Sequence, residues 1–155
     1  MSIVDPVFAK VTAAGSPFEI GERDGLRQFV SAPADLNALI DAARRHGDKT
    51  FIVEDDRRLT FEQVFQWRDQ LVPLLGIQRG DRVAFYARNC PEYVEALLAV
   101  LQIGAVHVNV NFRYTAGELR HVFANSGSRA VFLGAEFADR LADITDQLPE
   151  LVACI

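Results

Sequence analysis

The chain has few of the residues that most often identify a functional site. Of its 155 residues, only two are cysteine and three are histidine. Cys90 and Cys154 cannot build a disulfide framework, so we expect a reducing compartment and place the protein in the cytoplasm. The histidines have no metal-ligand spacing to one another or to the cysteines, which argues against a metal site.

The familiar motifs of phosphate binding and nucleophilic catalysis are absent as well. No G-x-G occurs anywhere, which removes the dinucleotide-binding fingerprint. No lysine follows two glycines at the spacing of a Walker loop, and no G-x-S-x-G nucleophile elbow is present. Taken residue by residue, the sequence therefore indicates a fold and no active site.

Charge and hydrophobic runs exclude two further classes of function. Sixteen basic against twenty-one acidic side chains give a net charge of −5, which is unlike a nucleic-acid-binding surface. The longest apolar region, residues 94–110, is interrupted by Glu95, Gln102, His107 and Asn109, so we predict no transmembrane segment. No basic stretch precedes an apolar run at the N-terminus, so we expect no secretory signal.

The chain has the length and composition of one ordinary globular domain. Hydrophobic residues make up 50% and charged residues 24% of it, and a chain of this length buries roughly 70% of its unfolded surface. Residues 1–32 lack clear periodicity and contain several glycines and two prolines. We expect these residues to form an irregular N-terminal arm, followed by an α/β segment over residues 33–155.

Caps and turns define the first elements of that segment. Asp35 is placed to cap a helix that Gly47 ends. The acidic turn at residues 54–56 lies between the short segments 50–53 and 57–59, which predicts a small β-hairpin within residues 50–59. The capping box T-F-E-Q begins a helix after Thr60, and Pro73 should kink or shorten it.

Strand and helix patterns alternate from residue 80 onward. A turn and an apolar strand at residues 83–86 precede a helix that begins at Pro91 and ends at Gly104. Further along, the pattern predicts strands at 106–110, 130–133 and from 151, with helices from 116 and over 136–148. This alternation predicts an α/β fold with a doubly wound, mostly parallel sheet that helices cover on both faces.

The helix after Pro91 is apolar around its whole circumference at residues 96–101. Such a helix must be buried on all sides. We expect the sheet to cover one side only, so the other side would form an exposed apolar patch. A homodimer through this exposed apolar surface is the predicted consequence.

Four segments resemble the core motifs of one enzyme family. They are L-T-F-E-Q-V at 59–64, G-D-R-V-A at 80–84, N-C-P-E at 89–92, and the run from 101 to 111. Together, over about residues 35–155, the chain resembles the N-terminal part of the AMP-forming acid–CoA ligases. These are the acyl-CoA synthetases of the adenylate-forming superfamily.

The resemblance includes several substitutions at motif positions. Phe61 stands at the usual tyrosine, Gln63 at the usual glutamate, Cys90 at the usual serine, and Asn109 where many members carry proline. The variant N-V-N-F-R-Y at 109–114 is more similar to bacterial fatty-acid and sterol-side-chain CoA ligases than to acetate or aryl-acid enzymes.

The resemblance implies a reaction and its reactants. In the family, a carboxylate attacks the α-phosphate of ATP to give acyl-AMP and pyrophosphate, and the thiol of CoA then displaces AMP. A fatty or related carboxylic acid and CoA are therefore the implied partners, and ATP, Mg²⁺ and CoA the implied cofactors of the intact enzyme.

Most of the family's nucleotide-binding motifs have no counterpart in these residues. The T-S-G-T-T-G-x-P-K phosphate loop, the Y-G-x-T-E segment, the T-G-D aspartate and the C-terminal lysine are all missing. We therefore expect a truncated N-terminal segment that by itself binds no cofactor, holds no catalytic residue and is inactive.

Polar residues leave the carboxyl end of the strand at 106–110, the edge at which open α/β sheets bind ligands. The candidates for lining a substrate or CoA channel in the intact enzyme are His107, Asn109, Asn111, Arg113 and Tyr114. The alternative is that His107 is a hydrogen-bonded sheet residue and that the others anchor a loop. For Cys90 the two alternatives are a structural thiol and a reactive thiol whose pKa is lowered by the start of a helix.

Two other functions remain open at this point. The same fold could serve as a non-catalytic binding or assembly module. A free-standing nucleotide-binding domain of flavodoxin type is a third reading, but no phosphate-loop sequence supports it.

Overall fold

The computed structural model describes residues 4–155 and divides the chain into two compact units, residues 1–39 and 40–155. The first unit contains helix α1 (Val4–Val11) and the antiparallel strands β1 (Ile20–Arg23) and β2 (Leu26–Phe29). The expectation of an irregular arm over residues 1–32 therefore needs correction, although residues 1–3 lie outside the described residues. The boundary predicted near residue 33 stays a prediction.

The turn sequence Asp24-Gly25 explains the β1–β2 hairpin, which hydrophobic periodicity did not predict. Asp24 and Gly25 join β1 to β2, and both have positive φ angles, +53° and +75°. An Asp-Gly pair in this conformation is the preferred two-residue connection between antiparallel strands. Strands of four residues with mixed polarity are too short to show a period of two.

The predicted caps and the small hairpin of the next segment are confirmed. Helix α2 (Leu36–Ala42) begins where the Asp35 carboxylate accepts the N–H of Ala38 at 2.7 Å, and a 3₁₀ turn, η1 (Ala43–His46), follows it. Strands β3 (Thr50–Glu54) and β4 (Arg57–Thr60) pair antiparallel. Helix α3 (Phe61–Leu71) then passes into a 3₁₀ turn, η2 (Val72–Leu74), which contains Pro73.

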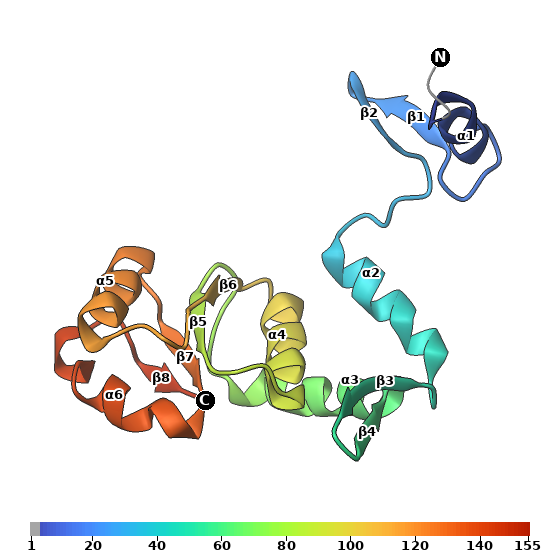
Figure 1. The fold of residues 1–155 in the computed structure, drawn as a ribbon. Helices are drawn as coiled ribbons and strands as arrows, with labels where there is room; N and C mark the ends of the chain where they lie inside the picture. Colours follow the sequence, from blue (N-terminus) through green and yellow to red (C-terminus); the bar gives the residue numbers. More distant parts are fainter. Residues whose placement is uncertain (1–3) are drawn as a thin grey trace. The chain divides into compact units, whose positions relative to one another are not determined.

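The α/β prediction is confirmed by a four-stranded parallel sheet in the order β6-β5-β7-β8. Its strands are β5 (Arg82–Tyr86), β6 (Val106–Asn109), β7 (Ala130–Leu133) and β8 (Ala153–Cys154). Helix α4 (Pro91–Ile103) lies on one side of this sheet, and α5 (Ala116–Ser126) and α6 (Ala138–Ala142) lie on the other (Figure 1). The connections between strands are therefore doubly wound.

Successive side chains of strand β5 belong alternately to two hydrophobic cores, one on each face of the sheet. Val83 and Phe85 join the core beneath α4, whereas Ala84 and Tyr86 join the core beneath α5 and α6. All four side chains are 0% exposed. A strand with both faces buried reads as a continuous apolar run, which is the pattern the sequence shows.

The prediction of one continuous helix over residues 136–148 is wrong. The structure has two 3₁₀ turns, η3 (Ala135–Phe137) and η4 (Thr145–Gln147), on either side of the short helix α6. The Thr145 hydroxyl donates to the Leu141 carbonyl at 2.9 Å, an interaction that competes with regular helix hydrogen bonding. Asp143 and Asp146 also place negative charge where a continuing helix would have its negative end.

The prediction that only the sheet covers α4 is also wrong. Helix α3 and the turn η2 pack against α4 as well, with Leu71, Val72 and Leu75 in the same core. Ala96, Ala99 and Val100 are buried as a result. The run at residues 96–101 does not form the exposed patch that the sequence pattern indicated.

Thr60 provides a direct test of the local folding rules. Its hydroxyl accepts the N–H of Gln63, and the Gln63 side chain accepts the N–H of Thr60, which completes the predicted capping box. Thr60→Ala should lower the free energy of unfolding by about 0.5–2 kcal/mol, while Thr60→Ser keeps the hydroxyl and should change it little. Urea denaturation of both variants tests this, and equal midpoints for Ala and wild type would contradict the cap.

Candidate functional site

The candidate site lies at the carboxyl ends of the central strands. The chain leaves β5 for β6 on one side and then crosses back to β7 on the other. Open α/β sheets bind ligands outside the strand ends at such a reversal. A cavity of about 270 Å³ occupies this position. Its lining residues come from the end of β7, the start of α4 and the segments that follow β5 and β7: Ala87, Arg88, Cys90, Glu92, Phe132, Leu133, Gly134, Ala135 and Glu136.

Charged side chains at this cavity are already paired with one another. Arg88 lies 3.5 Å from the Glu136 carboxylate. Glu92, in the first turn of α4, pairs with Arg57 of the β3–β4 hairpin at 2.5 Å, and this hydrogen bond lowers the pKa of the Glu92 carboxyl. The cavity therefore offers a balanced set of charges and no isolated ion.

The Cys90 thiol lines the cavity next to the start of α4. Burial raises its pKa above the ordinary value, and the neighbouring Glu92 acts in the same direction. The backbone N–H of Tyr93 is bonded to the Cys90 carbonyl at 3.2 Å. A thiol with a raised pKa is a poor nucleophile near neutral pH, so the geometry favours a structural role for Cys90.

His107 and Asn109 lie on the α4 side of β6 and share one partner. The Tyr93 hydroxyl lies 2.9 Å from His107 Nε2 and 3.4 Å from Asn109 Oδ1. Burial lowers the pKa of His107 and raises that of Tyr93, so both groups are neutral near pH 7. The Phe85 ring packs edge-on against His107, at 4.6 Å between ring centroids.

Asn111, Arg113 and Tyr114 are brought together in the turn that follows β6. The side-chain Oδ1 of Asn111 accepts the N–H of Arg113, and the backbone carbonyl of Asn111 accepts the N–H of Tyr114, both at 3.0 Å. The Arg113 guanidinium lies over the Phe112 ring, 5.5 Å from its centroid. The five predicted residues thus form two clusters, one against α4 and one in this turn.

Sequence patterns missed four residues around the second cluster: Tyr86, Arg88, Phe112 and Arg140. Arg88 lies over the Phe112 ring at 5.0 Å from its centroid, and Arg140 donates to the Tyr86 hydroxyl at 2.8 Å. Tyr86 ends the predicted strand at 83–86 and Phe112 falls inside the segment 109–114, so both could have been singled out as aromatic residues at strand ends. Arg140 had no such signal, because its partner Tyr86 is 54 positions away in the sequence.

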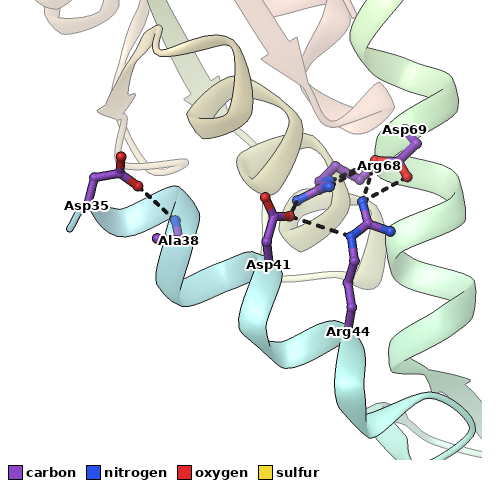
Figure 2. A network of polar contacts seen from close by, with 6 residues as sticks. All are labelled: Asp35, Ala38, Asp41, Arg44, Arg68 and Asp69. Atoms are coloured by element: carbon purple, nitrogen blue, oxygen red, sulfur yellow. Dashed lines mark hydrogen bonds and ion pairs between the residues drawn. The ribbon is translucent and has the colours of Figure 1, made fainter. Parts of the chain in front are cut away.

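A second polar network, away from the sheet edge, is occupied by structural contacts (Figure 2). The Arg68 side chain is almost fully buried and donates to Asp41 and Asp69, each at 2.9 Å. Arg44 also binds Asp69, at 2.8 Å. Burial alone would raise the pKa of Asp69, but the hydrogen bonds from Arg44 and Arg68 lower it. The ion pairs around the buried Arg68 guanidinium join η1 and α2 to α3.

Two further classes of site have no support in the described residues. Within residues 4–155, no group of three or more histidine, cysteine, aspartate or glutamate side chains could hold a metal ion. In the same range, no helix is long and apolar enough to cross a bilayer.

The chain is an α/β protein of the doubly wound class with a cavity at the carboxyl ends of β5 and β7. Residues 39–155 match the family described as AMP-binding enzyme. The chain belongs to this family, which confirms the resemblance found in the sequence motifs.

Known relatives are similar over the same part of the chain. A medium/long-chain-fatty-acid–CoA and 3-oxocholest-4-en-26-oate–CoA ligase of Mycobacterium tuberculosis is 37% identical over 107 residues, 67% of this chain and 20% of that protein. The 3-oxocholest-4-en-26-oate–CoA ligase of Rhodococcus rhodochrous is 33% identical over 105 residues, 66% of this chain and 19% of that protein. The chain thus spans about a fifth of the length of these relatives.

Solved structures agree with the fold. The crystal structure of the N-terminal domain of FACL13 from Mycobacterium tuberculosis superposes with a TM-score of 0.71 at 26% identity, covering 77% of this chain and 33% of that one.

Glu95 of α4 is a buried acid with an unusual environment. Its side chain is 5% exposed, and no described residue forms a hydrogen bond with its Oε1 atom. Burial raises the pKa of the Glu95 carboxyl, the negative charge of Glu92 raises it further, and Arg57 lowers it. The protonated form is therefore favoured in the folded protein more than in the unfolded chain.

Substitution of Glu95 by glutamine should reveal this pKa shift. A raised folded-state pKa means that the Glu95 contribution to stability is complete below the ordinary value of 4.5 and is lost as the pH rises through the folded-state value. Glu95→Gln should therefore be more stable than wild type near pH 7 and lose this advantage near pH 4. Urea unfolding across that range measures the difference, and Glu54→Gln, on the hairpin, is the matched control. A constant difference at all pH values would contradict the assignment.

Proposed function

We propose that this chain is the N-terminal part of an AMP-forming acid–CoA ligase. The enzyme would activate a fatty or related carboxylic acid as acyl-AMP and then transfer the acyl group to the CoA thiol. The observation that carries the proposal is the family match over residues 39–155, together with relatives whose names state ligation of fatty or steroid-side-chain acids to CoA.

The proposed chemistry proceeds in two displacements. A carboxylate oxygen of the acid forms a bond to the α-phosphorus of ATP, and pyrophosphate leaves. The CoA sulfur then forms a bond to the acyl carbon, its proton is released, and AMP leaves. ATP, Mg²⁺ and CoA belong to the intact enzyme in this proposal, and the cytoplasm, where all three are present, is its proposed location.

The role proposed for this chain is to shape part of the substrate or CoA channel. Asn111, Arg113 and Tyr114 would line it from the turn after β6, and His107 and Asn109 from the side facing α4. Hydrogen bonds that hold the side chains of His107, Asn109 and Asn111 in place support a shaping role. No catalytic residue is assigned to this chain.

Pyrophosphate exchange tests the proposal directly. The purified 155-residue chain, incubated with ATP, Mg²⁺ and fatty acids, should incorporate labelled pyrophosphate at the background rate, because no glycine-rich phosphate loop is present in it. The polypeptide as encoded by its gene should exchange well above background. Activity of the 155-residue chain would contradict the first expectation.

The encoded reading frame provides an independent check. A T-S-G-T-T-G-type loop encoded after Ile155 would agree with the ligase. An exchange rate at background for the encoded polypeptide with every acid tested would overturn the proposed function in favour of a non-catalytic binding or assembly module.

Self-association of the 155-residue chain is a further part of the proposal. Residues 96–101 do not supply the surface, but Trp67, Leu74 and Val152 are exposed at 57%, 79% and 64%. The outer edge of β8 is also unpaired within the described residues, and exposed strand edges recruit other strands. Sedimentation velocity should show dimers whose fraction rises with concentration, less so for Leu74→Gln. A monomer at all concentrations would contradict self-association.

A further inference from the structure

Arg140 of α6 is a charged side chain whose hydrogen bonds go to neutral oxygen atoms and whose guanidinium group lies 5.9 Å from the centroid of the Phe137 ring. Its Nη1 atom donates to the Tyr86 hydroxyl at 2.8 Å, to the Tyr114 carbonyl at 3.0 Å and to the Phe112 carbonyl at 3.2 Å. None of the ion pairs among residues 4–155 includes Arg140. Its guanidinium group binds the turn after β6 and neutralises no carboxylate.

Tyr86 connects this contact to the core of the domain. It is the last residue of β5 and fully buried, and its ring packs against Phe137 at 4.8 Å between centroids. Its hydroxyl accepts from Arg140 and donates to the Phe112 carbonyl at 3.5 Å. A buried phenol requires such partners. Tyr86 and Arg140 both donate to the Phe112 carbonyl.

The hydrogen bonds within the turn are local. The N–H groups of Arg113 and Tyr114 donate to Asn111, a near neighbour in the sequence, so these bonds shape the turn without fixing its place on the sheet. Phe112 and Tyr114 also pack against the core beneath α5 and α6, a contact that is apolar and not directional. Arg140 and Tyr86 supply bonds from distant elements. The Phe112 ring of the same turn lies 5.0 Å from the Arg88 guanidinium and 5.5 Å from the Arg113 guanidinium, measured from its centroid.

We infer that Arg140 is a positioning residue, which acts together with Tyr86 to hold residues 112–114 at the carboxyl edge of the sheet. The inference rests on the proposed function, in which this turn lines the substrate or CoA channel. Arg140 acts through the turn in this role and touches no reactant.

Hydrogen exchange on the 155-residue chain tests the anchor itself, whether or not the ligase proposal is correct. Arg140→Met keeps an unbranched apolar stem and removes every donor, so the amides of Arg113 and Tyr114 should exchange about tenfold faster. The amides of β5 and β7 should be unchanged. Arg140→Lys should restore protection, because one nitrogen makes all the contacts and a lysine ammonium places its donors on a single nitrogen.

Matched variants separate this role from general stability. Arg120→Gln removes another exposed arginine of the same layer, whose side chain donates to Gln147 at 3.0 Å, and it should leave the turn unchanged. Tyr86→Phe removes the hydroxyl alone and should accelerate the same amides to a smaller extent. Unchanged exchange in Arg140→Met, or equal acceleration throughout the sheet, would overturn the inference.

Steady-state kinetics of the encoded polypeptide then test the link to function. Arg140→Met should raise the KM for the acid or for CoA about tenfold while the KM for ATP changes little, and Arg140→Lys should recover most of the loss. A fall in kcat with every KM unchanged would overturn the positioning role. If the wild-type polypeptide shows no exchange of pyrophosphate, the proposed function fails while the hydrogen-exchange result still decides whether Arg140 anchors the turn.

Discussion

The burial of β5 on both faces is the constraint on which the α/β segment depends. Its four residues from Val83 to Tyr86 are inaccessible to solvent, so each face needs a complete layer of cover. Helix α4 with α3 supplies one layer, and α5 with α6 supplies the other. Since β5 pairs with β6 on one edge and β7 on the other, its carboxyl end lies between their two loops. The position of the candidate site is therefore a consequence of how the core is covered.

The groups around that site are rigidly placed because most are bonded to one another. His107 and Asn109 share the Tyr93 hydroxyl, Arg88 pairs with Glu136, and Arg140 binds the turn after β6. Preorganised polar groups of this kind hold a binding surface in place before a ligand arrives. Among the described residues they do not form a nucleophile with an adjacent base, which is consistent with the proposed role of shaping a channel. The relatives are about five times as long as the matched segment.

Arg68 and Glu95 are both buried, but the desolvation cost of their charges is offset to different extents. Arg68 has a carboxylate on each side, so its desolvation is offset by hydrogen bonds to Asp41 and Asp69. Glu95 is comparably buried, yet one of its oxygens has no hydrogen-bond partner in the described residues. Burial therefore favours its protonated form. Arg68 is a fixed connection between helices, whereas Glu95 makes the stability of the domain depend on pH.

Local rules in the sequence determined the elements and their class. Thr60 and Thr115 begin helices because their hydroxyls satisfy free backbone N–H groups, and Gly104 ends one because it adopts a positive φ at little cost. The apolar run of β5 predicted a strand buried on both faces, and the motifs predicted the family. Only the tertiary structure decided that α3 covers α4, that the helix after residue 136 breaks, and that Arg140 meets Tyr86. Capping and periodicity act between near neighbours and can be read along the chain, whereas these contacts depend on how distant elements pack.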